Sequence, residues 1–324
     1  MEYTTLGSTG MEVSQLCLGA MSFGSEEPWM LDPDDSREII ERAIDLGVNF
    51  FDTANAYSAG ESEKILGDVL SEYDRDEQVV ATKVRFPVGE DTPNASGLSR
   101  KTIEQELDDS LERLGMDTID LYQTHRVDPN TPPETTLRAL DDVVQQEKVR
   151  HVGTSSMWAY QLAQRLRVSE REDLVSYETM QNHYHLAYRE EEREMLPLTD
   201  EENMGVIPWG PLGQGFLTRP YEELEATERG DPENFHNPTV EYARGEGREI
   251  NERVQELAVE YGVTMAQIAL AWQYQNEYVT APIVGTTSVE HLEDAVEAME
   301  VDLASSDIDY LEEPYEPQPV IGHE

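Results

Sequence analysis

Four side chains with complementary proton chemistry lie at or just after the ends of apolar segments. Asp52 ends FFD, Tyr57 follows it by five residues, Lys83 closes VVATK and His125 closes IDLYQTH. A carboxylate, a phenol, an ammonium and an imidazole gathered at one place can give a proton to a carbonyl oxygen after a hydride has reached its carbon. The sequence therefore predicts a site for carbonyl reduction, with these four residues as the catalytic set.

Each of these residue types has its own task in such a reaction. A free phenol has a pKa of about 10, and a nearby ammonium favours its anion, so Tyr57 is the proton donor that Lys83 would assist. A lysine beside an apolar pocket tends to lose its proton unless a carboxylate keeps it charged, which is the role of Asp52. His125 would orient the carbonyl oxygen.

Strand and helix patterns alternate along the chain, which predicts a parallel sheet with crossover helices. Strands are expected at 15–19, 49–52, 79–83, 119–124, 150–154, 178–181, 205–208 and 281–284. Helices are expected at 35–46, 61–72, 100–114, 134–147, 158–168, 190–202, 248–275 and 289–300. We predict one domain over residues 1–324, a (β/α)8 TIM barrel whose strands carry the catalytic residues at their C-terminal ends.

Three further segments complete this barrel. A hairpin over residues 2–14, turning at GSTG, is expected to plug the bottom of the barrel, and a short helix at 304–313 leads into a C-terminal tail that could reach over the rim. The polar stretch from about 218 to 247 has no apolar period, and loops of this length are usually functional or disordered. We interpret it as a cofactor flap, with disorder as the alternative.

The chain is strongly acidic. It has 68 acidic and 23 basic side chains, a formal charge of −45, and only the lysines Lys64, Lys83, Lys101 and Lys148. Phosphate backbones and anionic membranes require clustered positive charge, so neither is an expected partner. Self-repulsion at this charge is relieved when molar salt shortens the Debye length to about 3 Å. We predict a halophilic protein of a salt-rich cytoplasm, the alternative being an ordinary acidic protein.

Cysteine usage and hydropathy add little chemistry. The single cysteine, Cys17, lies in the apolar run SQLCLGAM and is expected in the core. No secretory signal opens the chain and no apolar stretch approaches the roughly 20 residues of a membrane span. A soluble, intracellular protein without a metal site is expected, and its oligomeric state is open.

Several longer motifs resemble those of the aldo-keto reductases. FFDTANAY with GESEKILG, ATKV, LYQTH, VGTSSM, MQNHY and IPWGPLGQGFL occur in that family's order and spacing, from about residue 3 to the C-terminus. YREEEREMLPL (188–198) and EEPYEPQPVIG resemble the bacterial branch that includes a reductase linked to 1-deoxyxylulose 5-phosphate formation. Singly, each of the four catalytic candidates could be structural. At the family's spacing the catalytic interpretation is favoured.

The resemblance implies a nicotinamide dinucleotide that binds before an aldehyde or ketone. No G-x-G-x-x-G fingerprint follows the first strand, so the barrel loops must hold it. Ser155, Ser156 and Gln181 match the residues at the carboxamide, and Trp209 would stack on the nicotinamide ring or pack in the core. The loop over the pyrophosphate is matched by Pro211, Leu212, Gly213, Gly215 and Leu217.

The segment VGTTSVEHLEDA resembles the family's site for the adenosine 2′-phosphate. The residues assigned to it are Gly285, Thr286, Thr287, Ser288 and Asp294. Related chains commonly carry Arg where this one has Ser288, and loss of a charge-assisted contact weakens the case for exclusive NADPH use. N–H and hydroxyl groups at a helix N-terminus could still bind a phosphate. NADP(H) is favoured and NAD(H) is possible.

Residues on the loops after the strands are candidates for the substrate pocket. An aromatic pocket would use Phe23, Trp29, Phe86 and Trp158, any of which could instead be packing. Arg85 and Arg126 each lie within two residues of a catalytic candidate and could bind a substrate phosphate or carboxylate. The alternative is that each pairs with an acid, Arg126 with Asp128 for instance.

Two other functions share these features. The potassium-channel β subunits have the same fold and catalytic set and act on a protein partner, as a nicotinamide-sensing subunit would. A sugar-phosphate lyase or synthase is suggested by the bacterial branch, but the catalytic set offers no carbanion sink. We predict an NAD(P)H-dependent reductase of small-molecule carbonyl compounds.

Overall fold

The strands form a closed parallel barrel. The computed structural model describes residues 1–24, 29–90, 92–226 and 242–320. Its eight-stranded sheet has the order β10-β3-β4-β5-β6-β7-β8-β9. These strands are β3 (Cys17–Gly19), β4 (Phe50–Asp52), β5 (Val79–Val84), β6 (Ile119–Thr124), β7 (Val149–Ser155), β8 (Thr179–Gln181), β9 (Gly205–Val206) and β10 (Ile283–Gly285). The ring closes where the Ile283 N–H donates to the Pro208 carbonyl at 2.8 Å and Trp209 bridges to Ile283. The predicted (β/α)8 barrel is confirmed.

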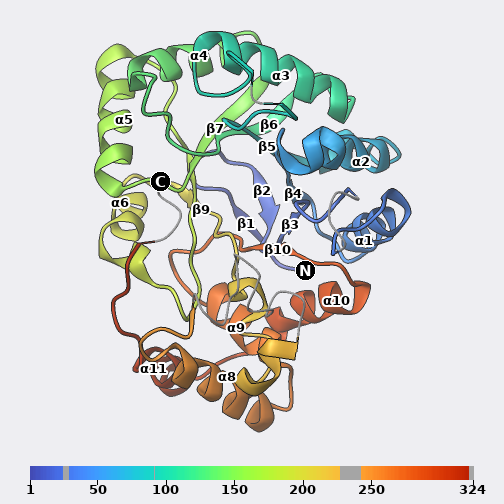
Figure 1. Ribbon diagram of the computed structural model, residues 1–324, viewed down its shortest axis with the longest axis vertical. Coiled ribbons are helices and arrows are strands. Elements are labelled where there is room, and N and C mark those ends of the chain that lie inside the picture. The colour runs from blue at the N-terminus through green and yellow to red at the C-terminus, as the bar shows by residue number, and fades with distance from the viewer. Residues whose placement is uncertain (25–28, 91, 227–241, 321–324) are drawn as a thin grey trace.

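Helices surround this ring (Figure 1). They are α1 (Pro33–Asp45), α2 (Glu61–Leu70), α3 (Arg100–Leu114), α4 (Pro133–Gln145), α5 (Ala159–Glu172), α6 (Met195–Glu201), α8 (Gly247–Tyr261), α9 (Met265–Tyr274), α10 (Val289–Glu297) and α11 (Ser305–Glu312). Each amphipathic helix turns its apolar stripe inward, as α4 does with Leu137, Leu140 and Val143. None of the described helices is long and apolar enough to cross a membrane.

The N-terminal hairpin closes the bottom of the barrel, as predicted. It consists of β1 (Tyr3–Thr5) and β2 (Glu12–Ser14), which pair antiparallel. Leu6 is fully buried in one cluster with residues at the lower ends of the strands, Val79 among them. Gly7 has φ +52°, and a Cβ there would lie 2.4 Å from the Gly205 nitrogen, so only glycine fits this close approach.

One predicted helix, 248–275, is wrong because the structure has two. Gly262 ends α8 in the left-handed region at φ +70°, where a glycine carries no steric cost. Thr264 then begins α9 with a capping box, in which Thr264 and Gln267 each bond to the other's backbone N–H. An apolar period that runs through both helices hid the break.

The predicted helix at 190–202 is also irregular. Residues Glu190–Arg193 form a 3-10 turn and α6 begins only at Met195. The acidic motif of this turn holds the C-terminal tail: the Tyr315 hydroxyl donates to Glu190 Oε1 at 2.8 Å. The short C-terminal helix is confirmed as α11. Half of the predicted flap, residues 227–241, lies outside the described residues.

Candidate active site

The inside of the barrel changes from apolar to polar toward the C-terminal ends of the strands. Phe50, Ala81 and Leu121 belong to the buried cluster above the hairpin. Two residues further along the same strands come Asp52, Lys83 and Gln123, and alternate strand residues point to the same side. The catalytic candidates on β4 and β5 therefore form the first polar layer on top of an apolar interior.

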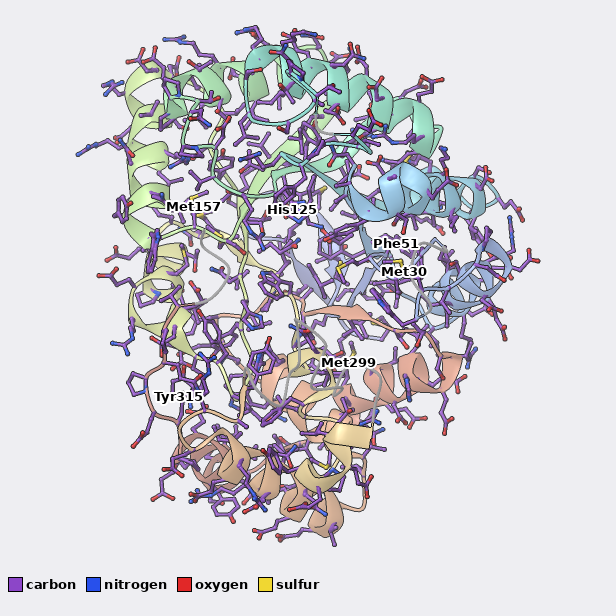
Figure 2. All side chains as sticks on the ribbon, viewed as in Figure 1. Met30, Phe51, His125, Met157, Met299 and Tyr315 are labelled. Atoms are coloured by element: carbon purple, nitrogen blue, oxygen red, sulfur yellow. The ribbon has the colours of Figure 1, made fainter. Side chains whose placement is uncertain are left out.

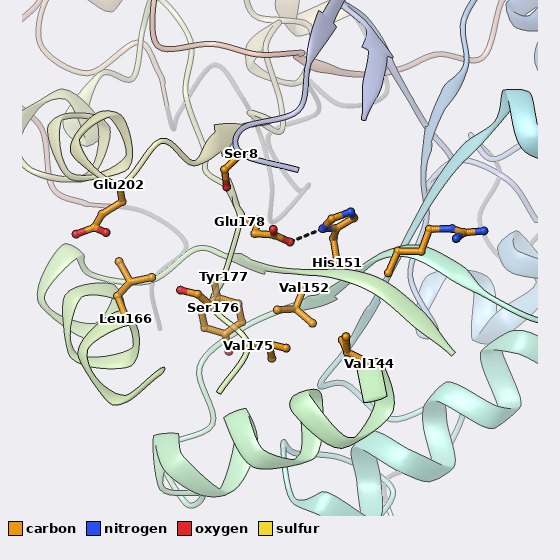
Figure 3. A pocket seen from close by; sticks show the side chains of 11 residues that line it. Ser8, Val144, His151, Val152, Leu166, Val175, Ser176, Tyr177, Glu178 and Glu202 are labelled. Carbon is orange, nitrogen blue, oxygen red and sulfur yellow. Dashed lines mark hydrogen bonds and ion pairs between the residues drawn. The ribbon is translucent and has the colours of Figure 1, made fainter. Parts of the chain in front are cut away.

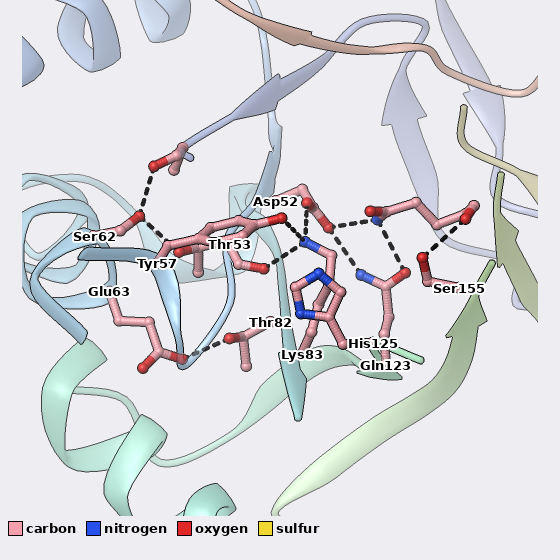
Figure 4. A network of polar contacts seen from close by, with 12 residues as sticks. Asp52, Thr53, Tyr57, Ser62, Glu63, Thr82, Lys83, Gln123, His125 and Ser155 are labelled. Carbon is pink, nitrogen blue, oxygen red and sulfur yellow. Dashed lines mark hydrogen bonds and ion pairs between the residues drawn. The ribbon is translucent and has the colours of Figure 1, made fainter. Parts of the chain in front are cut away.

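Lys83 joins Asp52 to Tyr57 (Figure 4). Its ammonium donates to Asp52 Oδ1 at 2.5 Å, to the Thr53 carbonyl at 2.8 Å and to the Tyr57 hydroxyl at 3.1 Å. The side chain of Lys83 is 0% exposed and that of Asp52 3%. Burial alone would lower the pKa of Lys83, but the charge of Asp52 and the contact with Tyr57 outweigh it, so the pKa is raised. Lys83 stays an ammonium beside the phenol.

The second carboxylate oxygen of Asp52 also has partners. Oδ2 accepts from Gln123 Nε2 at 2.8 Å and from Gln181 Nε2 at 2.9 Å. Gln123 was not among the sequence candidates. The signal was present: Gln123 precedes His125 by two residues, and a polar residue on the inward side of a barrel strand calls for a buried polar partner.

Tyr57 reaches Lys83 from a strained turn. It begins a 3-10 turn, Tyr57–Gly60, in which Ser58, Ala59 and Gly60 all have positive φ, at 46°, 50° and 91°. The Ser58 hydroxyl donates to the Phe23 carbonyl at 2.8 Å. A Cβ on Gly60 would lie 2.7 Å from the Arg113 side chain. Neighbours on both sides thus fix the turn that carries the phenol.

A buried ionic network supports the turn from behind, and sequence reasoning missed it. Glu63 is 0% exposed and accepts from Thr82 at 2.5 Å and from Arg113 at 2.6 Å. Glu106 accepts from Asn55 at 2.8 Å. The network links α2, β5 and α3, the elements around Tyr57 and Lys83. Because the residues of this network are far apart in the sequence, no local sequence pattern predicts that they bond to one another.

His125 lies beside Tyr57 at the end of β6, near the middle of the view in Figure 2. Its ring stands edge-on to Tyr57 at 5.7 Å and to Phe86 at 5.0 Å between centroids. Burial, together with the charges of Lys83 and Arg126, holds the pKa of His125 well below its usual range. The imidazole is therefore neutral at pH 7, and one of its nitrogens carries a proton that can be donated.

Arg126 has no acidic partner among the described residues. Its guanidinium donates to the His125 carbonyl at 2.8 Å and to Ser155 Oγ at 3.3 Å. Asp128, the partner considered above, accepts instead from Leu98, Asn130 and Thr131. Pairing of Arg126 with Asp128 is therefore wrong. Arg85 is half-buried; it donates to the Val127 carbonyl at 3.5 Å, and its charge is among the causes that lower the pKa of Asp128.

The carboxamide candidates gather on the other side of Asp52. Ser155 Oγ donates to the Gln181 carbonyl at 2.9 Å, and Ser156 Oγ accepts from Trp209 Nε1 at 3.0 Å. The Trp209 ring stacks on His183, with centroids 3.9 Å apart and 18° between planes. The structure thus brings Ser155, Ser156, Gln181 and Trp209 together, and Gln181 joins this group to the Asp52 carboxylate.

The remaining cofactor candidates lie on two loops. Gly213 and Gly215 bound a 3-10 turn in which both have positive φ, at 55° and 99°. Leu217 is fully buried in the core beside α8 and α9, so only its backbone could face a ligand. The other loop residues placed near them are Pro211, half-buried Leu212 and Gln214.

At the end of β10 the polar groups bond mainly to each other. Thr286 Oγ1 accepts from the Ser288 N–H at 3.1 Å and donates to the Ser288 carbonyl at 3.0 Å. Gly285 and Thr287 are exposed. Burial and the neighbouring Glu297 raise the pKa of Asp294 on α10.

The aromatic candidates for the pocket divide into two groups. Phe23 is fully buried in the main core, where it packs. Phe86 is 38% exposed and Trp158 40%, and Phe86 contacts His125. Trp29 is half-buried. Phe86 is thus the aromatic candidate for which a contact with His125 is seen.

A separate hollow lies at the opposite end of the barrel. It measures about 370 Å³ and is lined by the start of β7, the residues before β8 and the hairpin turn, with Ser8, His151 and Glu178 in its wall (Figure 3). His151 Nδ1 lies 2.6 Å from Glu178 Oε2. In a barrel this N-terminal end serves stability, whereas chemistry lies at the other end.

Comparison with known proteins bears on the whole chain. The profile of the Aldo/keto reductase family matches residues 15–316. Aldo-keto reductase AFTS1 of Alternaria alternata is 39% identical, covering 99% of this chain and 93% of that protein. Versiconal hemiacetal acetate reductase of Aspergillus parasiticus is 38% identical, covering 99% and 98%. Aldo-keto reductase dtxS3 of Metarhizium robertsii is 39% identical, covering 100% and 93%.

The match spans nearly the entire barrel and includes the ends of all the strands that carry the site. Identity near 40% over such a length leaves no doubt about common descent. The chain belongs to the aldo/keto reductase family and is an oxidoreductase enzyme.

Proposed function

We propose that this enzyme reduces aldehydes or ketones to alcohols, or catalyses the reverse oxidation, with Tyr57 as the general acid. The observation that carries the proposal is the contact of one fully buried ammonium, Lys83, with both Asp52 and the Tyr57 hydroxyl. Such an arrangement favours the phenolate that remains after the proton has left. It lies at the end of the barrel where such enzymes carry out chemistry.

The chain's own residues account for the proton. Tyr57 donates its hydroxyl proton to the carbonyl oxygen, and the Lys83 ammonium stabilises the resulting phenolate. Neutral His125 donates a hydrogen bond to the same oxygen and so fixes its position. Phe86, which contacts His125, would help to exclude water.

The residues present fit a nicotinamide dinucleotide, which when bound supplies the hydride. Gln181 Oε1 receives no hydrogen bond from a described residue, and the Gln181 backbone carbonyl accepts from the Ser155 hydroxyl, which lies 3.4 Å from that of Ser156. An amide oxygen that can still accept, on a residue in contact with this pair of hydroxyls, complements a primary amide such as the nicotinamide carboxamide. At Gly215, where a Cβ would meet only the Thr218 hydroxyl at 3.9 Å, the left-handed turn leaves the backbone open to a pyrophosphate.

The preference between the two dinucleotides is proposed to be weak. The family uses nicotinamide cofactors, and NADP(H) remains favoured. Yet Arg42, a cation that contacts α10, already binds Glu293 at 2.6 Å. A 2′-phosphate at Ser288 would meet hydroxyl and N–H groups without a partner of opposite charge.

The substrate is a small carbonyl compound, and we propose that it is anionic. Arg126 is a half-buried cation in a chain of net charge −45, and it lies next to His125 without a carboxylate partner in the part of the chain that the structure describes. Burial lowers the pKa of Arg126, although a guanidinium stays charged at neutral pH. A phosphate or carboxylate on the substrate would complete its hydrogen bonds.

A substrate panel tests the proposal. Aldehydes, ketones and sugar phosphates are assayed with NADPH and with NADH in molar KCl, following absorbance of the reduced dinucleotide. We expect turnover with several carbonyl compounds and faster turnover with anionic ones. Absence of turnover with every compound, although the dinucleotide binds, would refute the proposal. The panel also tests the narrower resemblance to the bacterial branch, which remains a prediction.

We also propose that the protein works in concentrated salt, as in a halophilic cytoplasm. The charge of −45 is the supporting observation. Screening by molar KCl reduces the repulsion that opposes the compact state. Melting temperature measured from about 50 mM to 3 M KCl should rise steadily; an unchanged value would contradict the salt requirement.

A further inference from the structure

We propose that Gln123 and Gln181 form an amide bridge, which ties the carboxamide of the bound dinucleotide to the proton-donating residues. Both side chains are buried, and both donate to the same oxygen of Asp52, at 2.8 and 2.9 Å. Gln181 Nε2 also lies 3.2 Å from Gln123 Oε1. The inference rests on the proposed function and assigns both residues a positioning role within it.

The hydrogen bonds of Asp52 explain what the bridge does. Oδ1 accepts from Lys83, and among the described residues Oδ2 accepts only from the two amides. A buried carboxylate needs such donors, because an unmet acceptor in a dry site is costly. The amide bridge therefore sets the position of Asp52, and through Lys83 that of Tyr57.

The other polar groups of Gln181 would meet the carboxamide of the cofactor. Its Nε2 donates to Asp52, and no described residue donates to its Oε1, which leaves that oxygen as the acceptor for the carboxamide. Its backbone carbonyl accepts from Ser155 Oγ at 2.9 Å and from the Ser156 N–H at 3.1 Å. Gln181 thus contacts both Ser155 and Ser156, which are assigned to the nicotinamide carboxamide, and the carboxylate of Asp52.

The bridge also has an electrostatic effect. Its N–H dipoles offset part of the negative charge of Asp52, which otherwise opposes phenolate formation at Tyr57. Besides Asp52 and Tyr57, the titratable or charged groups around the amide bridge are Cys17, Lys83, His125 and Arg126. Burial and Asp52 keep Cys17 a neutral thiol by raising its pKa, and His125 is neutral, so Lys83 and Arg126 are the remaining charges. Loss of an amide should make phenolate formation harder.

Three variants test the bridge: Gln123→Leu, Gln181→Leu and, as control, Gln273→Leu. Gln273 is also a fully buried amide, but it donates to the Tyr184 carbonyl away from the site. The measurements are kcat against pH and the dissociation constant of the oxidised dinucleotide from quenching of tryptophan fluorescence. Melting temperature checks folding, and Gln123→Met replaces the leucine variant if that one does not fold.

For Gln123→Leu we expect kcat to fall by about 10- to 100-fold, the scale of a lost hydrogen bond to a charge. The basic limb of its pH profile should move to higher pH, while dinucleotide affinity stays unchanged. For Gln181→Leu we expect the same movement of the basic limb and, in addition, about 10-fold weaker dinucleotide binding. Gln273→Leu should alter neither measurement.

The possible failures are distinct. If Gln123→Leu keeps the wild-type pH profile, or if Gln181→Leu changes only dinucleotide affinity, the amide bridge is refuted while the reductase function stands. If wild-type enzyme binds dinucleotide but reduces no carbonyl compound, the proposed function itself fails.

Discussion

At the ends of β4, β5 and β6 every polar atom of the Asp52 and Lys83 side chains has a hydrogen-bond partner, and both side chains are buried. At the end of β10, by contrast, Thr286 bonds to the backbone of Ser288, and the neighbouring residues are exposed. The first region can be changed only at high cost, because each group holds the next. In the second region a single residue can be replaced without disturbing a network of buried contacts. The chemistry is thus fixed more firmly than the choice of dinucleotide.

The largest effect is expected from a change in the first region, at the phenol that Lys83 contacts. Tyr57→Phe should lower kcat by about 10²- to 10⁴-fold, because a general acid contributes on that scale. Dinucleotide affinity should stay nearly the same, since the phenol acts in the chemical step. Steady-state kinetics and fluorescence titration measure the two quantities. The control is Tyr160→Phe, at a tyrosine that is 67% exposed. More than about a tenth of wild-type kcat in Tyr57→Phe would exclude it as proton donor.

The next largest effect is expected for KM when Arg126, at the edge of the first region, is replaced. Arg126→Ala should raise KM for phosphorylated or carboxylated substrates by about 10- to 150-fold, the equivalent of a lost charge-assisted contact of roughly 1.5 to 3 kcal/mol. A neutral aldehyde should be almost unaffected. The assays share one KCl concentration, because salt screens the contact. Arg167→Ala, at an exposed arginine of α5, is the control. Equal losses for neutral and anionic substrates would make Arg126 structural.

The second region is expected to respond more mildly. Ser288→Arg should shift preference toward NADPH by roughly 1 to 3 kcal/mol, because it supplies the missing cation for a 2′-phosphate. The ratio of kcat/KM for NADPH and NADH measures the shift, and Ser288→Gln controls for side-chain length. A wild-type enzyme that already prefers NADPH by more than about a thousandfold, some 4 kcal/mol, would show that another residue reads the phosphate.

The smallest expected effect concerns the free energy of unfolding, through the buried residue His185. Burial and the neighbouring His183 hold the pKa of His185 well below its usual range, so the folded protein keeps it neutral. The unfolded chain binds this proton below about pH 6.5, and stability is therefore lost as pH falls through that value. Between about pH 7.5 and 5.5 the wild type should lose about 1.4 kcal/mol more than His185→Asn.

Denaturant unfolding at fixed molar KCl measures this difference. The asparagine keeps an acceptor near the Ala187 N–H, which bonds to His185 Nδ1 at 3.2 Å. Because both proteins carry the same carboxylates, acid effects on the surface cancel in the comparison. Parallel stability curves for the two proteins would contradict the assignment.

Sequence patterns predicted the strands of the barrel, the hairpin plug and the convergence of Asp52, Tyr57 and Lys83, because each depends on local periodicity or on a motif. They failed where partners are distant. The inward position of Gln123 calls for a buried polar partner, but nothing near it identifies that partner as Asp52, and nothing near Glu63 reveals Arg113. The freedom of Arg126 from Asp128 was equally hidden. A side chain's choice among several partners is settled by packing in three dimensions, which a one-dimensional pattern does not contain.

The turn after Tyr57 has a consequence for anyone who tries to make this enzyme more stable. Ser58 and Ala59 occupy backbone conformations that cost roughly 1 kcal/mol or more for residues other than glycine. Glycine at residue 59 would relieve that cost in the folded state, yet it would widen the conformational range of the arm that presents the phenol. A search for thermostable variants that ignored turnover could therefore select Ala59→Gly and lose catalytic precision. Directed evolution here should score rate and melting temperature together.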